Sequence, residues 1–299
     1  PSETLFGIQI ASCRPGEVAR CCELLETQGV SCDFIDFNSA CPIDPITSIG
    51  CGAALLEKPT RLGNCLLAAS KTLKALPLTL KIRVGRDEKD PTVHRIPRLQ
   101  EWGVDAVVLH GRSRNQRYTK RSDWNYIGTC RKLLAETCPD VTMIGNGDIF
   151  CPEDYESNLT SSGVSTATIA RAALIKPWIF SEIGKRGALW DISSSERLEM
   201  LRDFSRFGLE HWGSDTQGVE TTRRFMCEWQ SYLWRYIPVA LLEVLPPHVA
   251  DRPPAYRGRD DLETLFASDL VSDWVKITEM FLGPAPPAFK FVPKHKSNT

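Results

Sequence analysis

Short apolar runs alternate with amphipathic stretches through the first 190 residues of the chain. The apolar runs are rich in Val, Ile and Phe, which is typical of strands. They predict six strands, at Phe6–Ile10, Cys32–Phe37, Leu78–Val84, Ala106–Leu109, Val141–Ile144 and Thr166–Ile169. The stretches between them predict helices at Gly16–Gln28, Lys58–Leu76, Pro91–Trp102 and Trp124–Thr137. Several runs are apolar throughout, so we expect a parallel sheet buried on both faces, in a (β/α) barrel or a doubly wound fold.

Polar residues at the strand ends favour the barrel. One lies within each predicted strand or one to two residues after its end: Gln9, Asn38, Lys81, His110, Asn146 and Arg171. A TIM barrel builds its active site from the C-terminal ends of its strands. Because an eight-stranded barrel needs two further strands, we expect these to precede Pro1 and the chain to be an N-terminally truncated fragment. The last two predicted strands are then strands seven and eight, and the loops after them, Gly145–Asp148 and Ala170–Ala173, are the usual phosphate site of this fold.

The pattern changes to helices after about residue 190. Ser193, with Glu196 three residues later, is a helix-capping signal, and apolar residues then recur at helical spacing. We therefore predict an α/β chain with a TIM (β/α)8 barrel domain over residues 1–190, a small all-α domain over 191–283 and a basic tail over 284–299. A proline-rich link within the helical domain contains Pro246, Pro247, Pro253 and Pro254.

Composition narrows the classes of function. The 299 residues carry a formal net charge of −1, so any surface for nucleic acid is local. The eleven cysteines follow no regular spacing, and no secretory segment or long apolar run is visible. This indicates reduced thiols, no membrane partner and a cytoplasmic or nuclear location. No C-x2-C pair exists and the five histidines are scattered, so we predict no metal site in this segment.

Cys41 is the sharpest candidate for chemistry. It follows a predicted strand, in a loop that Pro42 and Pro45 stiffen. A lone cysteine is usually a small buried hydrophobe, which is our interpretation of most of the other ten. A thiol at the mouth of a barrel is placed to deliver a proton, and its ordinary pKa suits a general acid. Position alone leaves both interpretations open.

Lys81 and His110 are the two titratable groups among the strand-end residues. Lys81 interrupts an apolar strand, and a lysine there either extends its ammonium to water or faces the barrel mouth. We favour a cation that stabilises negative charge on a cofactor or substrate. His110 alone is weak evidence, because a histidine is often a satisfied core residue. His110 together with Asn38, Lys81, Asn146 and Arg171 makes five polar residues on neighbouring strand ends, which are harder to explain by packing.

The segment after His110 is strongly basic. It contains Arg112, Arg114, Arg117, Lys120 and Arg121, with Tyr118 among them and no acid before Asp123. A charge run is most often a solvated loop. At the mouth of a barrel, however, this combination suits contacts with phosphates and stacking on a base. Further basic residues lie in the helical domain and the tail: Arg223, Arg224, Lys290, Lys294, His295 and Lys296.

Six phrases of the sequence resemble, in order and spacing, the tRNA-dihydrouridine synthases. They are NSACPID, GCGAALLEKP, KIRVG, LHGRSRNQRYTKRSDW, IGNGDI and IARAALIKPW. The phrases CPID, HGRSRNQRYTK and ISSSERLEMLRDFSRFGLEHWGSDTQGVE are similar to the eukaryotic class 3 branch, which reduces uridine 47 in the variable loop of tRNA. The resemblance covers nearly the whole chain and implies a flavin-binding barrel followed by a helical domain that holds tRNA.

The resemblance implies roles for individual residues. Cys41 matches the family's catalytic cysteine, which protonates C5 of uridine while a hydride passes from flavin N5 to C6. NADPH is the implied reductant of FMN, and tRNA is the implied partner, with mRNA as a further RNA partner. The residues that match contacts with FMN are Gln9, Asn38, Lys81, His110, Asn146, Gly147, Asp148, Ala170 and Arg171.

Two positions depart from the family pattern. Ala40 replaces the usual glycine before the catalytic cysteine, and Ala172 replaces the glycine of ARGA. An added methyl group there either crowds the phosphate or excludes a backbone conformation with positive φ. Two alternatives stay open: an FMN barrel that acts on a free pyrimidine, and a tRNA-binding protein with impaired catalysis.

Overall fold

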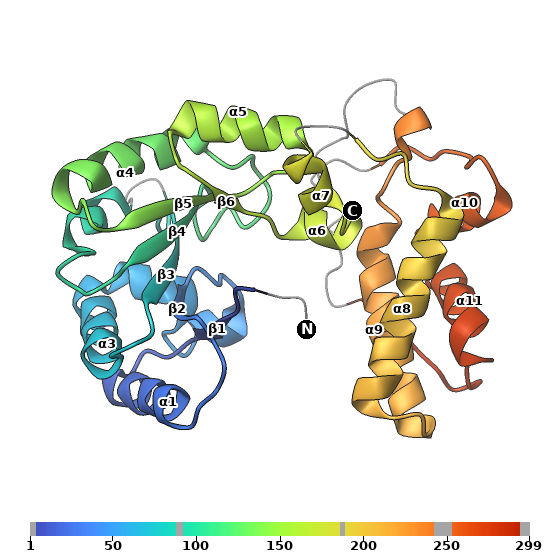
Figure 1. The fold of residues 1–299 in the computed structure, drawn as a ribbon, viewed down its shortest axis with the longest axis horizontal. Coiled ribbons are helices and arrows are strands. Elements are labelled where there is room, and N and C mark those ends of the chain that lie inside the picture. Colours follow the sequence, from blue (N-terminus) through green and yellow to red (C-terminus); the bar gives the residue numbers. More distant parts are fainter. Residues whose placement is uncertain (1–3, 88–91, 186–188, 242–252, 294–299) are drawn as a thin grey trace. The chain divides into compact units, whose positions relative to one another are not determined.

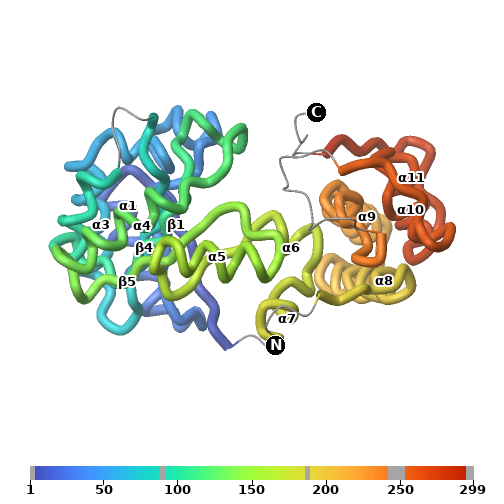
Figure 2. The backbone as a smooth tube through the Cα atoms, turned by 90° about the horizontal axis from the view of Figure 1, so that it is seen from above, coloured from blue at the N-terminus to red at the C-terminus, as the bar shows by residue number. Residues whose placement is uncertain are grey.

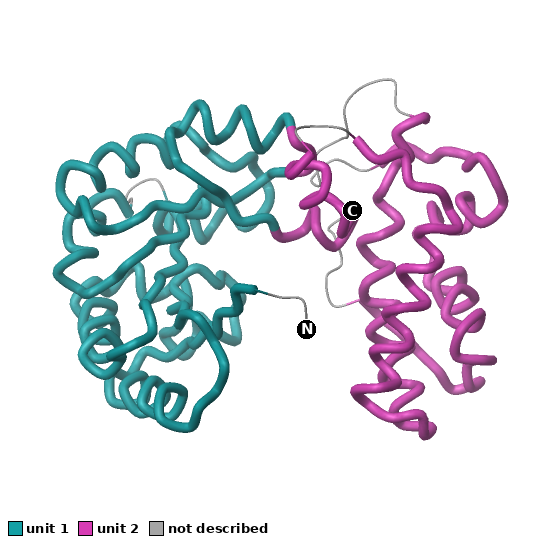
Figure 3. Tube along the Cα trace, in the orientation of Figure 1, with its two compact units in different colours: residues 1–149, 153–169 teal, residues 150–152, 170–299 magenta. Residues whose placement is uncertain are grey.

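The computed structural model describes residues 4–87, 92–185, 189–241 and 253–293. The described chain divides into two compact units, one of residues 1–149 and 153–169 and one of residues 150–152 and 170–299 (Figure 3). The prediction of a helical domain from residue 191 followed the change in pattern along the sequence. The structure groups α6 (Arg171–Ile175) with the helices instead, because α6 contacts α9 (Thr216–Leu233).

The first unit is built on a parallel sheet of six strands, counted over the described residues. The strands are β1 (Gly7–Ile10), β2 (Phe34–Ser39), β3 (Leu78–Arg83), β4 (Ala106–His110), β5 (Thr142–Asn146) and β6 (Ala167–Thr168). They pair in the order of the sequence from β1 to β6, each parallel to the next (Figure 1). This is the arrangement of part of a (β/α)8 barrel, and all six predicted strands are confirmed.

Helices cover one face of this sheet. They are α1 (Pro15–Thr27), α3 (Pro59–Thr72) and α4 (Trp124–Thr137), which lie outside the arc of strands in Figure 1. Their apolar side chains pack on fully buried strand residues such as Ile35, Leu80 and Leu109. Asp123 begins α4 by accepting a hydrogen bond from the backbone N–H of Tyr126, as an N-cap residue does.

The sequence predicted that several strands are apolar throughout, and this does not hold for β2 and β3. β2 and β3 alternate, with apolar residues on the helix side and Asp36, Asn38, Thr79 and Lys81 on the other. Period-two alternation puts every second side chain on the opposite face, so the second face of these two strands is polar, while β4 and β5 add Val108 and Ile144 beside Lys81. The polar face is the one that corresponds to the interior of a barrel.

Some connecting elements differ from expectation. The segment predicted as a helix from Pro91 to Trp102 is a short 3-10 helix, η2 (Thr92–Arg98), that contains Pro97, while Pro91 lies outside the described residues. A proline inside a helix removes a backbone donor, which explains the shorter element. The elements that were not predicted include α2 (Asp44–Thr47), η1 (Gly52–Glu57) and α5 (Pro152–Ser162).

The second unit is helical. It contains α6, α7 (Ile179–Gly184), α8 (Ser194–Trp212), α9, η3 (Val239–Leu241), α10 (Asp261–Phe266) and α11 (Val271–Leu282). Helices α8 to α11 group together in Figure 2 around a core that includes Leu201, Met226 and Ile277. The predicted capping box of Ser193 and Glu196 is confirmed at the start of α8. Pro246 and Pro247 of the proline-rich link lie outside the described residues.

Candidate active site

The polar face of the sheet carries most of the strand-end residues in register. Asn38 pairs with Lys81 across β2 and β3, and His110 pairs with Asn146 across β4 and β5. Gln9 pairs with Asp36 at the β1 end of the same face. Because paired residues of neighbouring strands point to one side, the sheet brings the predicted residues of the first unit together on one surface.

A hydrogen-bond chain runs across β1, β2 and β3. The amide of Gln9 donates to Asp36 Oδ2 at 2.6 Å, and Thr79 Oγ1 donates to Asp36 Oδ1 at 2.6 Å. Asn38 Nδ2 donates to Gln9 Oε1 at 2.7 Å. Asp36 was not singled out from the sequence, although its place two residues before Asn38 is a signal, since residues two apart in a strand share a face. Its carboxylate orients Gln9, and Gln9 orients Asn38.

Asn38 also holds the loop of Cys41. Its Oδ1 accepts hydrogen bonds from the backbone N–H groups of Ala40 and Cys41, both at 3.0 Å. The carbonyl of Cys41 accepts from the backbone N–H of Ala53 at 2.9 Å. The Cys41 side chain is partly exposed. The loop therefore presents a thiol whose backbone is fixed on both sides by hydrogen bonds.

Lys81 lies at the centre of the polar face. Its ammonium donates to Asn146 Oδ1 at 3.0 Å, and Asn146 Nδ2 in turn donates to the carbonyl of Thr168. Burial lowers the pKa of Lys81 to about 8, while the negative charge of Asp36 opposes this shift and the positive charge of Arg83 adds to it. Lys81 is thus still mainly cationic at neutral pH, in surroundings that stabilise the charge poorly. A negative group brought to this face would stabilise the cation.

Arg112 is not placed as the sequence suggested. Its side chain is only 1% exposed, and its guanidinium holds both carboxylate oxygens of Asp148 at 2.7 and 2.6 Å. It also donates to the carbonyl of Lys120 and lies 3.3 Å from His110 Nε2. The expected contact of Arg112 with phosphates is therefore corrected: Arg112 is a buried residue that anchors the basic segment from within.

Asp148 has a similar role on the other side of this ion pair. One of its carboxylate oxygens also accepts the backbone N–H of Ser122 at 2.8 Å. Its backbone is in the left-handed region, with φ of 53°, a conformation that Asp tolerates better than most residues. The Asp148 carboxylate therefore binds the Arg112 guanidinium and the Ser122 backbone N–H within this unit.

Gly147, next to Asp148, is tightly packed against Ser122 and His110. It has φ of 124°, and a Cβ atom built on it would lie 2.3 Å from Ser122 Oγ and 3.0 Å from His110 Cδ2. Both the conformation and the space exclude any other residue.

The other basic residues lie nearer the surface. Arg114 is partly buried and pairs with Glu57 at 2.6 Å, whereas Arg117 is exposed and pairs with Asp44 at 3.1 Å. Lys120 and Arg121 are exposed as well. The segment from Arg114 to Arg121, called the basic loop below, thus presents three cationic side chains to solvent. The predicted local basic surface is present even though the net charge of the chain is near zero.

Arg83, at the end of β3, is a residue that sequence reasoning missed. Its guanidinium is 2% exposed and donates to the carbonyls of Ala40 at 2.8 Å and of Ser113 and Arg117 at 3.3 Å. Arg83 is two residues after Lys81, so it occupies the same face of the strand. That spacing was the available signal.

The described residues contain no group of three or more His, Cys, Asp or Glu side chains that could hold a metal ion. No helix in the described ranges is both long enough and apolar enough to cross a membrane. None of the eleven cysteines, all of them in described parts of the chain, forms a disulfide.

Comparison with known families decides the relationship. The sequence profile described as dihydrouridine synthase (Dus) matches residues 1–213 of the 299. The chain belongs to the dihydrouridine synthase family. The match spans the strands of the first unit, including the loop of Cys41 and the basic loop, and extends to the end of α8 in the second unit.

Individual relatives are similar over nearly the whole chain. A tRNA-dihydrouridine(47) synthase of Cryptococcus neoformans var. neoformans serotype D (strain B-3501A), with NAD(P)(+) in its name, is 50% identical over 307 residues, which cover 99% of this chain and 42% of the relative. A Homo sapiens protein with the same name ending in "-like" is 50% identical over 297 residues, covering 99% and 44%. One from Oryza sativa subsp. japonica is 51% identical over 303 residues, covering 99% and 43%.

The chain therefore spans less than half the length of these relatives. Among solved structures, "PhdJ bound to substrate intermediate" covers 93% of this chain, and the match covers 96% of that structure's chain. It has 12% identity and a TM-score of 0.37, a likeness that carries no argument.

The remaining predicted residues of this dihydrouridine synthase chain lie in the second unit. Ala170 is the residue before α6, Arg171 is the first residue of α6 and Ala172 is buried within it. Arg117 and Asp148 are the two described residues other than glycine with positive φ, so the alanine at 172 causes no backbone strain. Ala172 therefore does not occupy the left-handed conformation that only the family's glycine would favour.

Two arginines of the helical unit differ in their surroundings. Arg223 is fully buried and donates to Thr278 Oγ1 and to the carbonyls of Leu282 and Gly283 at the end of α11. It is a structural cap rather than the surface cation that the sequence suggested. Arg224 is exposed and donates to the carbonyl of Lys290. Of the tail residues, Lys294, His295 and Lys296 lie outside the described residues.

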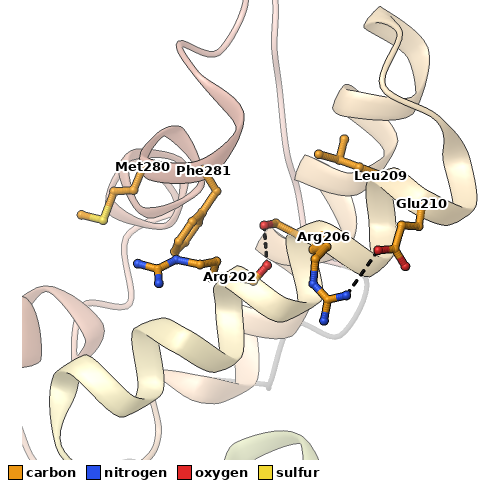
Figure 4. Close-up of a pocket in the computed structure, with 7 residues that line it drawn as sticks. Arg202, Arg206, Leu209, Glu210, Met280 and Phe281 are labelled. Atoms are coloured by element: carbon orange, nitrogen blue, oxygen red, sulfur yellow. Dashed lines mark hydrogen bonds and ion pairs between the residues drawn. The ribbon is translucent and has the colours of Figure 1, made fainter. Parts of the chain in front are cut away.

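A shallow hollow on the helical unit lies between α8 and α11. Figure 4 shows Arg206 and Glu210 joined across one turn of α8, at 3.3 Å, with Met280 and Phe281 on α11. The second arginine of the hollow, Arg202, pairs with Glu199 at 2.6 Å. Both arginines are thus balanced by acids of the same helix, and none of the predicted site residues lines the hollow.

Proposed function

We propose that this chain reduces uridine to 5,6-dihydrouridine in tRNA, at position 47. The observation that carries the proposal is the polar face of the sheet. There Asn38 pairs with Lys81 of the next strand and holds the Cys41 loop by hydrogen bonds. Relatives about half identical to the chain are named tRNA-dihydrouridine(47) synthases, which supports the choice of substrate and position. Their names also support NAD(P)H as the source of reducing equivalents, and we propose NADPH.

The residues of the polar face suit FMN as the bound cofactor. Gln9, Asn38, Lys81 and His110 would face the ring, and Gly147, packed against His110, would lie beside it. Asn146 and Asp148 complete the proposed set in the first unit, Asp148 through its ion pair with Arg112. Ala170 and Arg171, in the second unit, are proposed from the family resemblance alone. When bound, a reduced flavin supplies the hydride that is added to C6 of uracil.

Within this proposal Cys41 provides the proton. Its thiol donates to C5 of the uracil ring, and the thiolate is reprotonated from solvent, to which the side chain is partly open. Lys81 holds a positive charge on the same face and stabilises negative charge on the reduced ring. A protonation at C5 needs the thiol in a fixed place, and the hydrogen bonds of Asn38 to the Cys41 loop provide it.

The basic loop is proposed to bind the RNA. Arg117, Lys120 and Arg121 are exposed cations for phosphates, and Tyr118 offers a half-exposed ring on which a base can stack. Arg114 belongs to the proposed RNA-binding set although its guanidinium also pairs with Glu57. Arg112 supports the loop from inside through its ion pair with Asp148. The target base must leave its stack to reach the sheet, at a cost of a few kcal/mol that these contacts offset.

The test is a reaction of the full-length protein with tRNA that lacks dihydrouridine. We expect NADPH-dependent formation of dihydrouridine at position 47, mapped by mass spectrometry, and none in a tRNA whose uridine 47 is replaced by cytidine. Free uracil and uridine serve as controls for an enzyme of free pyrimidines. A protein that holds flavin and oxidises NADPH yet leaves uridine 47 unchanged would refute the proposal.

We also propose a location in the cytoplasm or nucleus, which the free thiols support.

A further inference from the structure

One buried arginine connects the loop that carries Cys41 with the basic loop. Arg83 Nε donates to the carbonyl of Ala40, the residue before Cys41. Nη1 of the same guanidinium donates to the carbonyls of Ser113 and Arg117 at the other side. Each carbonyl is 30 or more residues from Arg83 in sequence, and the two loops meet at a single planar group.

The charge of Arg83 is held without a carboxylate. Among the described residues, no Asp or Glu forms an ion pair with it; three carbonyls and the face of Tyr118, with the ring centroid 5.7 Å away, surround the guanidinium. Burial accordingly lowers the pKa of Arg83. A buried cation without a counter-ion is costly compared with an apolar side chain of similar size. Packing alone therefore does not explain why an arginine occupies this position.

The basic loop adopts an unusual backbone conformation at the residue whose carbonyl binds Arg83. Arg117 has φ of 47°, in the left-handed region that residues other than glycine seldom adopt, and its carbonyl accepts from Arg83. Its side chain turns the other way, to Asp44, three residues after Cys41. Ser113 and Gln116 close the turn between them through two reciprocal hydrogen bonds. The basic loop thus contacts the Cys41 loop twice, once through Arg83 and once at the surface.

Only arginine can make this connection. Its planar fork presents Nε and Nη1 in fixed directions, so one side chain binds carbonyls of two loops at once. A lysine has the same charge but a single nitrogen, which can approach one loop at the expense of the other. The two links differ in strength, because the exposed pair of Arg117 and Asp44 is weak and a phosphate can compete for Arg117.

We propose that Arg83 is a positioning residue that sets the place of the Cys41 thiol relative to RNA held on the basic loop. When a phosphate takes Arg117 from Asp44, Arg83 remains as the connection that keeps Ala40 and the carbonyl of Arg117 in one arrangement. This inference rests on the proposed function, because it assigns the basic loop to RNA. Arg83 itself does not transfer the proton.

The test compares Arg83→Lys with a matched control, Arg95→Lys. Arg95 is also a buried arginine of the first unit, and it donates to the carbonyl of Leu56 outside both loops. The first readout needs neither flavin nor RNA: the rate at which iodoacetamide alkylates Cys41, measured by peptide mass spectrometry against Cys32 in the same sample. We expect Cys41 to react at least fivefold faster in Arg83→Lys, with Cys32 unchanged, and neither to change in Arg95→Lys.

The second readout separates position from affinity. In full-length protein at saturating tRNA, single-turnover reduction of uridine should fall about 100-fold in Arg83→Lys, as a misplaced reacting group predicts. Reduction of the protein by NADPH and the Kd for tRNA should stay within threefold of wild type. Arg83→Gln, which removes the buried charge, provides a second variant if Arg83→Lys unfolds, and thermal unfolding of all variants controls for stability.

Each other outcome is decisive. Unchanged alkylation of Cys41 in both Arg83 variants would overturn the inference. A loss of tRNA affinity as large as the loss of rate, with Cys41 reactivity unchanged, would make Arg83 an RNA contact and overturn it as well. If the wild-type protein reduces no uridine, the proposed function fails, and the alkylation comparison still decides whether Arg83 positions Cys41.

Discussion

Replacing Lys81 by methionine tests the electrostatics of the polar face. Methionine keeps most of the length of the side chain and removes its charge. The structure places the ammonium where burial lowers its pKa from 10.5 to about 8, despite the attraction of Asp36. Such a lysine lowers the free energy of unfolding whenever it is protonated in the folded state. We therefore expect Lys81→Met to relieve that cost and to abolish the contribution of Lys81 to the chemistry.

The magnitude follows from the two pKa values. At about 1.4 kcal/mol per pH unit, a pKa of about 8 instead of 10.5 corresponds to about 3 kcal/mol. The variant also loses the hydrogen bond to Asn146, whose amide oxygen is then left without that donor, at a cost of about 1–3 kcal/mol. These two terms nearly cancel at neutral pH, so a measurement at one pH decides little. Their pH dependence separates them.

The direction of that dependence is fixed by linkage. Below about pH 8 the lysine is protonated in both states, and the folded state carries the full cost. Between about pH 8 and 10.5 the unfolded state binds the proton and the folded state does not, so the wild type gains stability as the pH rises. The methionine variant lacks this gain. The hydrogen-bond term stays constant over the same range.

The assay is urea unfolding of cofactor-free wild-type and Lys81→Met protein at pH values from 7 to 10.5. We expect the wild type to gain about 3 kcal/mol relative to the variant across this range. Other groups that titrate there are common to both proteins and cancel in the difference. Lys132→Met, on the exposed surface of α4, is the control and should show no such trend. Parallel pH profiles for wild type and Lys81→Met would refute the placement of Lys81.

Three further predictions concern other parts of the first unit. Cys41→Ala should retain flavin, seen by its absorbance, and lose uridine reduction, because the thiol supplies a proton and need not hold the cofactor; normal turnover would contradict the role of Cys41. Arg117→Ala with Lys120→Ala should weaken tRNA binding and flatten its salt dependence while reduction by NADPH is unchanged, and a double variant with the wild-type salt slope would mean that the loop is only solvated. Asp148→Asn should lower the free energy of unfolding by about 3–5 kcal/mol, since it leaves buried Arg112 without its counter-ion; a urea midpoint equal to that of wild type would count against this.

Local signals in the sequence were sufficient for the strands and for the residues at their ends. Period and composition are properties of neighbouring residues, so Asn38, Lys81 and His110 could be placed on one edge of a sheet before any coordinates. The alternation in FIDFNS and LTLKIR also contained the polar face, although several strands were interpreted as apolar throughout. The spacing of Arg83 from Lys81 placed it on the same face, but its three carbonyl partners lie in two other loops and could not be inferred from the sequence.

What the sequence by itself determined is the order of the elements, the family resemblance and the identity of the groups available for chemistry. The tertiary structure alone decided how each of them is used. Arg112 and Arg117 look equivalent in the basic segment, yet Arg112 turns inward to Asp148, 36 residues ahead, while Arg117 stays at the surface. The physical reason is that burial and ion pairing are set by contacts between segments distant in the chain, and such contacts exist only once the sheet has brought the segments together.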